Sequence, residues 1–218
     1  TQKVVLFGGS NDTGLLNDTW TWDGSNWSLR NVALAPPARV RFGMGVHPAS
    51  GNVVLYGGFD DNGPRDDTWT WNGTSWKKEA PTKIPDSKYG SLVVSDGLDC
   101  FLLQNKLIWR WEGQDWVNLP DIPMPDWDPN KWGAEGAWDP VDKSFLVIGP
   151  GATYRGKATS GFNKWGTADL VFGGVLAYSG KSFVRMSLEA PDDLWRAERT
   201  FLLPDETKEW VRLDDLDL

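Results

Sequence analysis

Residues suited to redox, nucleophilic or metal chemistry are few in this chain of 218 residues, which has one histidine, His47, and one cysteine, Cys100. A single histidine excludes every centre that needs two, including His-rich zinc and copper sites. A single cysteine excludes an internal disulfide and leaves no disulfide pattern from which to infer a compartment. His47 precedes Pro48 in a predicted turn and Cys100 falls in an apolar run, so we expect a turn residue and a buried core thiol. A Ser-His-Asp triad would have to use His47, and no nucleophile-elbow glycine pattern accompanies it.

Two stretches rich in aspartate and asparagine, residues 11–14 and 60–63, could hold a cation. Neither has the alternating ligands followed by a distant Glu that a helix-loop-helix calcium site requires. Asn or Asp shortly before Gly is typical of Asx turns. We therefore expect turns at both stretches, with a calcium ion as the alternative, and we expect no cofactor.

A basic residue, an aromatic residue and a glycine occur together four times. Cations gathered at one opening would focus positive potential and suit a carboxylate or an acidic peptide, although the chain as a whole has a net charge of −8. In the alternative interpretation, each cation pairs with an aspartate of a neighbouring repeat and only holds the structure together. The four triplets are Arg41-Phe42-Gly43, Lys88-Tyr89-Gly90, Lys131-Trp132-Gly133 and Lys164-Trp165-Gly166.

An internal repeat must position these residues. The run at 4–9 recurs at 53–58, and the segment at 18–27, which reads Asp-Thr-Trp-Thr-Trp, then Asp-Gly and a third Trp, recurs at 67–76. Both pairs are offset by 49 residues without a gap. Tryptophans at period two indicate a strand, and Asp-Gly or Asn-Gly supplies a tight turn into the next one. Each copy therefore predicts a small antiparallel sheet.

Later copies are weaker. Residues 108–116 keep the tryptophan spacing, residues 137–149 align with 45–57 at an offset of 92, and residues 175–186 with 194–213 form a degenerate fifth copy. No amphipathic helix of convincing length occurs. The sequence thus predicts one all-β domain over 1–218, with clear repeats at 4–116 and degenerate repeats at 132–218.

Tryptophan is in excess, with 15 in the chain. Nine of them are one three-position pattern written three times, at 20, 22 and 27, at 69, 71 and 76, and at 109, 111 and 116. Fixed positions in a repeat indicate a core between sheets. Trp127, Trp132 and Trp165 lie outside the pattern, so they are better candidates for stacking on a sugar ring.

Charge and hydropathy exclude some partners. The acidic balance has no basic footprint, so we expect no nucleic-acid partner. The longest apolar runs have five or six residues, against the ~20 of a membrane helix, so we expect no membrane insertion. The chain opens on Thr1 without a signal-peptide pattern, and we expect a trimmed or excised product.

The double glycine followed by spaced aromatic residues resembles the kelch repeat, most closely the bacterial form with an Asp-Thr-Trp-Thr-Trp segment. The resemblance is strong over 4–116 and fair over 132–149. It implies a β-propeller in which the first strand of each blade lines a central channel. The copies give about four or five blades, and 4–9 matches a second strand with no first strand before it. Either the C-terminal tail completes that blade, or the chain is part of the larger propeller, of six or seven blades, that is usual in the family.

The resemblance also implies ligand positions, because in peptide-binding kelch propellers the start of each innermost strand and the residues after the double glycine point into one mouth of the channel. A centre like that of galactose oxidase would need two histidines, and this chain has one. Lysine or carboxylate enzymes, like the sialic acid mutarotases of this fold, stay open. The candidate ligand-binding residues are the cations Arg41, Lys88, Lys131 and Lys164, the post-glycine residues Ser10, Asn11, Phe59 and Asp60, and the aromatic residues Trp132 and Trp165.

Taken together, these features predict a non-enzymatic binding module, a protein-interaction scaffold that takes a protein or acidic peptide at one mouth of the channel. One alternative is a lectin or a sugar-processing enzyme on the same face, with a glycan as ligand. Another is a structural subunit of a larger assembly, in which self-association or another segment completes the first blade. The fold by itself does not decide among them.

Overall fold

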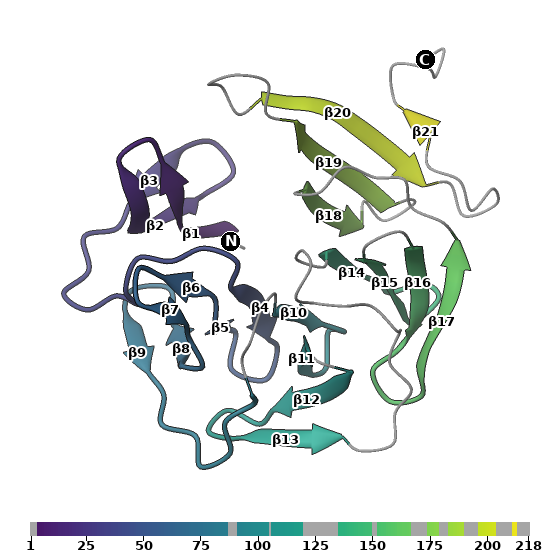
Figure 1. Ribbon diagram of the computed structural model, residues 1–218, viewed down its shortest axis with the longest axis horizontal. Coiled ribbons are helices and arrows are strands. Elements are labelled where there is room, and N and C mark those ends of the chain that lie inside the picture. The colour runs from purple at the N-terminus through teal and green to yellow at the C-terminus, as the bar shows by residue number, and fades with distance from the viewer. Residues whose placement is uncertain are drawn as a thin grey trace.

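The computed structural model describes residues 4–86, 91–104, 106–119, 135–149 and 152–166, and four later strands within 174–212. From residue 165 onward the description covers the backbone only. All regular structure in these residues is β-strand, and no helix that could span a bilayer occurs among them (Figure 1).

The strands form five sheets that follow one another along the chain, numbered here from the N-terminus (Figure 1). Within each sheet, neighbouring strands are antiparallel and in chain order, except that the hairpin β6 (Phe59–Asp60) and β7 (Gly63–Pro64) is inserted in sheet two. Sheet one is β1 (Val4–Asn11), β2 (Gly14–Trp22) and β3 (Trp27–Leu29); sheet two is β4 (Gly43–His47), β5 (Asn52–Tyr56), β8 (Thr68–Trp71) and β9 (Trp76–Lys78). Sheet three is β10 (Leu92–Ser95), β11 (Cys100–Gln104), β12 (Leu107–Trp111) and β13 (Trp116–Leu119); sheet four is β14 (Glu135–Asp139), β15 (Ser144–Gly149), β16 (Ala152–Lys157) and β17 (Gly161–Gly166). Sheet five is β18 (Gly174–Tyr178), β19 (Phe183–Glu189), β20 (Arg196–Leu203) and β21 (Val211–Arg212).

The sequence repeat is also a repeat of strand register. Leu6 lies opposite Trp20 in sheet one, and Leu55 lies opposite Trp69 in sheet two, at the same offset of 49 residues. Leu102 lies opposite Trp109 in sheet three. Because side chains alternate along a strand, equal register places equivalent residues on equivalent faces of successive sheets.

The last two strands of the repeat are connected by tight turns, as expected, and these are Asx turns. Asp23 Oδ1 accepts the backbone N–H groups of Ser25 at 2.8 Å and Asn26 at 2.9 Å, and Asn72 does the same one repeat later. Gly24 has a φ of 106°, which a glycine adopts without the steric penalty of a side chain. Short polar side chains thus fix the turn that brings β3 back along β2.

Each repeat sheet has two chemically different faces. In sheet two, Leu55 and the three tryptophans at 69, 71 and 76 lie on one side, here called the tryptophan face. Val54, Tyr56, Thr68 and Thr70 alternate with them and make the other side, here called the threonine face.

The tryptophan face of one sheet packs on the threonine face of the sheet before it. Trp76 of sheet two lies edge-on to Phe7 of sheet one, with ring centroids 5.2 Å apart, and its Nε1 donates to Thr19 Oγ1 at 2.9 Å. Trp116 of sheet three repeats this arrangement, with its ring 5.6 Å from Tyr56 and its Nε1 donating to Thr68 Oγ1 at 2.9 Å. Burial of such a side chain contributes about 1.5–3 kcal/mol, and the hydroxyl satisfies the indole N–H.

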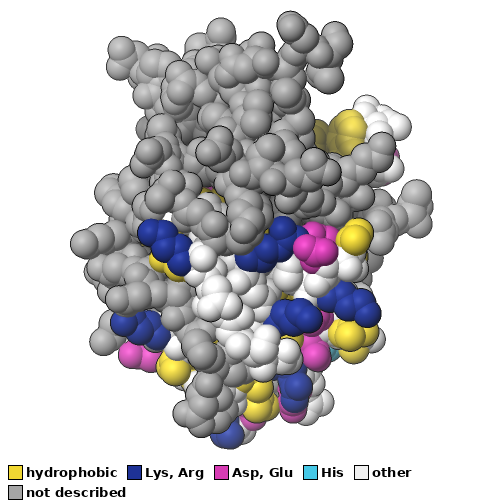
Figure 2. Space-filling view, turned by 90° about the vertical axis from the view of Figure 1, so that its right-hand side faces the viewer, with side chains coloured by type: hydrophobic (Ala, Val, Ile, Leu, Met, Phe, Trp, Pro, Cys, Tyr) yellow, Lys and Arg dark blue, Asp and Glu magenta, His cyan; other side chains and the backbone are white. Residues whose placement is uncertain are grey.

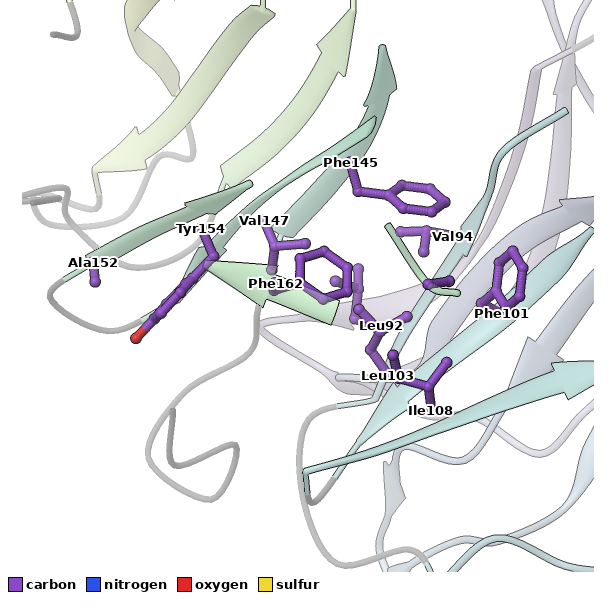
Figure 3. Packing of buried hydrophobic residues seen from close by; sticks show 11 residues of the cluster. Leu92, Val94, Phe101, Leu103, Ile108, Phe145, Val147, Ala152, Tyr154 and Phe162 are labelled. Carbon is purple, nitrogen blue, oxygen red and sulfur yellow. The ribbon is translucent and has the colours of Figure 1, made fainter. Parts of the chain in front are cut away.

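Sheets three and four pack through aliphatic and phenylalanine side chains instead. Figure 3 shows Val94 and Phe101 of sheet three facing Phe145 of sheet four, and the rings of Phe101 and Phe145 lie 6.2 Å apart. The weaker fourth copy of the repeat therefore keeps the sheet-on-sheet contact while changing the side chains that make it.

Small residues let the first strands of neighbouring sheets approach each other. A Cβ on Gly43 of β4 would lie 2.6 Å from Val93 Cγ2 of β10, and one on Gly136 of β14 would lie 2.9 Å from Leu92 Cδ2. β4, β10 and β14 lie toward the middle of Figure 1, and β9, β13 and β17 lie at its edge. The glycines thus allow the sheets to converge on the side of their first strands.

The prediction that the repeated tryptophans form a core is confirmed for Trp69, Trp71, Trp76, Trp111 and Trp116, which are all buried. It is wrong for Trp27, whose side chain is 48% exposed, against 3% for its equivalent Trp76. The reason is that no described sheet packs on the tryptophan face of sheet one.

Candidate functional site

The candidate site is built around residues 39–42, which connect sheet one to β4. Arg39 O accepts the backbone N–H of Gly9 at 3.0 Å, and Arg39 N–H donates to Leu16 O at 3.1 Å. Val40 exchanges backbone hydrogen bonds with Phe59 in both directions, at 2.9 and 2.8 Å. The connection is therefore fastened between the β1–β2 hairpin and the β6–β7 hairpin, and it brings the loop tips of two successive sheets together.

A buried ion pair anchors this connection. The Arg39 side chain is fully buried; its Nη1 and Nη2 donate to the two carboxylate oxygens of Asp67 at 2.6 and 3.0 Å, and Nη1 also donates to Gly57 O at 2.8 Å. Burial acts to raise the pKa of Asp67, but the hydrogen bonds from Arg39 and from Trp69 Nε1 outweigh it, and the pKa lies below its ordinary value. The ionised pair thus ties the connection to the start of β8.

Arg41 has the unusual backbone of this segment. Its φ is 57°, in the left-handed region that costs a residue with a side chain about 1–2 kcal/mol, and its side chain is exposed. The neighbouring Phe42 is held by edge-on contact with Phe7, with centroids 5.6 Å apart, and by close approach to the backbone of Gly58. The fixed residues on both sides impose the conformation of Arg41 and direct its side chain away from the core.

The remaining candidates in this region are in turns. Asn11 Oδ1 accepts the backbone N–H of Thr13 at 2.9 Å, and Asp60 Oδ1 accepts that of Asn62 at 2.8 Å, which confirms the expected Asx turns. Arg65 Nε donates to the other oxygen of Asp60 at 2.6 Å. Desolvation opposes it, but this hydrogen bond holds the pKa of Asp60 below its ordinary value. Within the described ranges, no three His, Cys, Asp or Glu side chains are grouped to hold a metal ion.

Five of the ten candidate residues therefore share one end of the molecule, at the loop tips of sheets one and two: Ser10, Asn11, Arg41, Phe59 and Asp60. Lys88, Lys131 and Trp132 lie outside the described residues, as does the side chain of Trp165.

Lys164 does not occupy the predicted position at the start of an innermost strand. It lies in β17, the last strand of sheet four, which pairs with β16 and is three strands away from β14. A motif of three residues can also occur in a strand with another place in its sheet. Here the hairpin between β16 and β17 places the triplet in the last strand of sheet four rather than before the first strand of a sheet.

Strand register also changes the equivalence among the other three cations. Met44 and Val93 hold the same place opposite Leu55 and Leu102, and Lys88 precedes Val93 by five residues, as Arg39 precedes Met44. At the offset of 92, Lys131 likewise corresponds to position 39. Sequence reasoning had aligned both lysines with Arg41, because the triplet was counted from its aromatic residue rather than from the strand that follows.

His47 and Cys100 have the structural places expected of them. His47 ends β4, and its Nδ1 lies 2.8 Å from Ser50 Oγ in the turn that follows. Cys100 is fully buried, and burial, together with the nearby Asp99 and Asp96 carboxylates, raises the pKa of its thiol to about 12. Neither residue is placed for nucleophilic chemistry.

Sequence reasoning missed a polar cluster on sheet four. Arg155 donates to Ser144 Oγ at 2.9 Å, to Asp142 at 2.7 Å and to the buried Asp139, beside a shallow depression of about 360 Å³. Two carboxylates neutralise this guanidinium. On this side of the described surface, Lys and Arg are interspersed with Asp and Glu (Figure 2). Finding this cluster requires the pairing of β15 with β16, which brings Arg155 to Ser144 and which the sequence motifs do not predict.

The fold and these contacts define an all-β protein of repeated antiparallel sheets. Comparison with solved structures agrees with that class: the structure of YjhT superimposes with a TM-score of 0.65, over 96% of this chain and 80% of that chain, at 14% sequence identity. At this identity the similarity concerns the fold alone. No family model matches the chain, and no curated protein matches it.

Proposed function

We propose that the protein is a non-enzymatic binding module with a kelch-type propeller architecture, each sheet being one blade, and that it takes an acidic peptide or protein segment at the end formed by residues 9–14, 39–42 and 58–65. The observation that carries this proposal is Arg41, an exposed cation held in a left-handed conformation between two fixed neighbours. Strained backbone of this kind persists where the surroundings impose it, and it is concentrated in binding sites.

The surroundings of Arg41 suit recognition of a peptide. Phe59 offers a half-buried ring, and the Asn11 and Asp60 turns present backbone at the same end. Arg65 neutralises Asp60, so the carboxylate does not oppose an incoming anion. A carboxylate on the ligand would form a charge-assisted hydrogen bond with a guanidinium whose backbone is already fixed.

The test is a binding titration of the full chain with a fluorescein-labelled hexaglutamate peptide, with hexaglutamine as the uncharged control. Arg41→Glu should weaken hexaglutamate binding at least about tenfold, which corresponds to 1.4 kcal/mol. The Tm of the variant should equal that of the wild type. Lys143→Glu, an equal charge change at an exposed lysine that also has a left-handed backbone, with a φ of 52° in the turn between β14 and β15, should leave the affinity within about twofold. Equal affinities of the wild type and Arg41→Glu for hexaglutamate would refute the site.

The two lysines at position 39 of their repeats are separable from Arg41 in the same titration. Lys88→Glu and Lys131→Glu distinguish a cation that contacts ligand from one that holds the structure, because the first lowers affinity at constant stability and the second lowers the unfolding temperature. A glycan array run on the same preparation tests the carbohydrate alternative.

A further inference from the structure

Sheet one has an apolar face that the rest of the described molecule leaves uncovered. Val4 pairs with Trp22 and Trp22 with Trp27, and Leu6 pairs with Trp20 and Trp20 with Leu29, so these six side chains lie on the same side of the sheet. Leu6 is 51% exposed and Leu29 is 49% exposed. This is the tryptophan face of sheet one, and it is rich in the large apolar groups that mark interaction surfaces.

The same face is covered in the next two sheets. Leu55 and Leu102, the equivalents of Leu6, are both fully buried, and so is Trp116, an equivalent of Trp27. The covering element is the threonine face of the preceding sheet in both cases. The chain therefore shows twice which surface packs on a tryptophan face, namely the threonine face of another repeat sheet.

The hydrogen bonds of the buried tryptophans also indicate that a threonine face covers a tryptophan face. Trp76 Nε1 donates to Thr19 Oγ1 and Trp116 Nε1 donates to Thr68 Oγ1, each at 2.9 Å. Within the part of the chain that the structure describes, the indole N–H of Trp27 has no hydrogen-bond partner, and the aromatic partner of its ring is Trp22, with centroids 5.6 Å apart. A threonine hydroxyl at the equivalent place would satisfy it.

The register of sheet five places different residue types at the equivalent positions. In its register, Arg185 takes the place of Val54, and Arg199 takes the place of Thr68. By register, the sequence thus has arginine at two positions where sheet two has valine and threonine.

We infer that the tryptophan face of sheet one is a docking surface for a further repeat sheet from outside these 218 residues, one with an aliphatic and an aromatic residue on its second strand and a threonine directly before the first tryptophan of its third. The inference goes beyond the Arg41 site and does not depend on it. Each contact would copy one that the chain already makes twice.

The first test asks whether the face is open. Trp27→Ser should lower the Tm by only about 1–2 °C, as expected for an exposed side chain, whereas Trp76→Ser should lower it by roughly 10 °C or more. Equal losses would mean that the face is already covered within the chain, and would overturn the inference.

The second test supplies the missing sheet. In an extended chain, residues 4–52 are repeated once so that Asn52 is followed by Val4, which reproduces the natural spacing of Asn52 and Val53. The added copy then presents Phe7 and Thr19 to the original Trp27. The Tm should rise, and the ¹⁹F line of 5-fluorotryptophan at the original position 27, assigned by Trp27→Phe in that copy, should lose its solvent isotope shift, whereas the line from Trp27 of the added copy should keep it.

The matched control is the same extended chain with Thr19→Arg in the added copy, which should restore the solvent isotope shift of Trp27. An added copy that folds and leaves the original Trp27 solvent-exposed would refute the inference. Sedimentation of the original chain tests the remaining occupant, since dimers that dissociate on Trp27→Ser would assign the face to a second copy and overturn the docking of an outside repeat sheet.

Discussion

Replacing Asp67 by asparagine tests the anchoring of the candidate site. The substitution keeps the size of the side chain and one acceptor oxygen, but it leaves the fully buried Arg39 guanidinium without a counter-charge. Breaking a buried ion pair by removing one partner costs about 3–5 kcal/mol. Because Asp67 retains 14% side-chain exposure, we expect a value at the lower end, about 3 kcal/mol.

The matched control is Asp18→Asn in sheet one. Asp18 stands 49 residues before Asp67 and accepts the Trp20 indole N–H at 2.6 Å, as Asp67 accepts that of Trp69, but no arginine pairs with it among the described residues. Loss of this hydrogen bond should cost about 1 kcal/mol. Urea unfolding followed by circular dichroism measures both, and the difference of about 2 kcal/mol corresponds to roughly 4–8 °C in Tm.

The pH dependence provides an independent measure of the same pair. The pKa of Asp67 is lowered by folding, so its contribution is fully present above the unfolded value of about 3.9 and is lost as the pH falls through the folded pKa. Asp67→Asn should therefore be less sensitive than the wild type to acid below about pH 4. Equal stability of the Asp67→Asn and Asp18→Asn variants at pH 7 would refute the anchoring role of Arg39.

Two further predictions concern the repeat itself. Gly58→Ala should destabilise the fold by more than about 2 kcal/mol, because φ is 92° and the new Cβ would lie 2.7 Å from Val40 O, whereas Gly24→Ala, with a φ of 106° and open space around it, should cost only about 1 kcal/mol; chemical denaturation compares the two. Cys100 should not react with a disulfide reagent at pH 8 until the chain unfolds, because its thiol is buried and its pKa is about 12; rapid labelling of the native protein would contradict that placement.

The repeat made much of the fold predictable. The offset of 49 residues, the tryptophans at period two and the Asp-Gly or Asn-Gly turns predicted β1, β2, β3, β5, β8 and β9, because local pattern alone determines strand, turn and face there. Even the degenerate copies gave strands in the expected regions, including the four of sheet five.

What sequence could not supply was context between segments. Trp27 has the same local pattern as Trp76, and the difference in exposure arises only from whether another sheet lies against it. The sequence analysis did not single out Arg39, because its partner Asp67 is 28 residues away along the chain. The repeated aspartate before each Trp-Thr-Trp was the one sequence feature that pointed to a partner for a buried cation. The place of Lys164 depended on a hairpin, which a three-residue motif does not encode.

The contact between successive sheets joins two unlike surfaces, an indole donor on one side and a hydroxyl acceptor on the other, and this makes the array directional. A directional contact can be lengthened by duplicating a whole 49-residue unit, since each new unit brings one donor surface and one acceptor surface and leaves the number of unmatched ends unchanged. The unit can differ in length where its connections absorb the change, since Trp109 follows Trp69 by only 40 residues and Trp116 still donates to Thr68. The runs that the first two copies share, 4–6 with 53–55 and 18–22 with 67–71, are what such growth by whole units would leave behind.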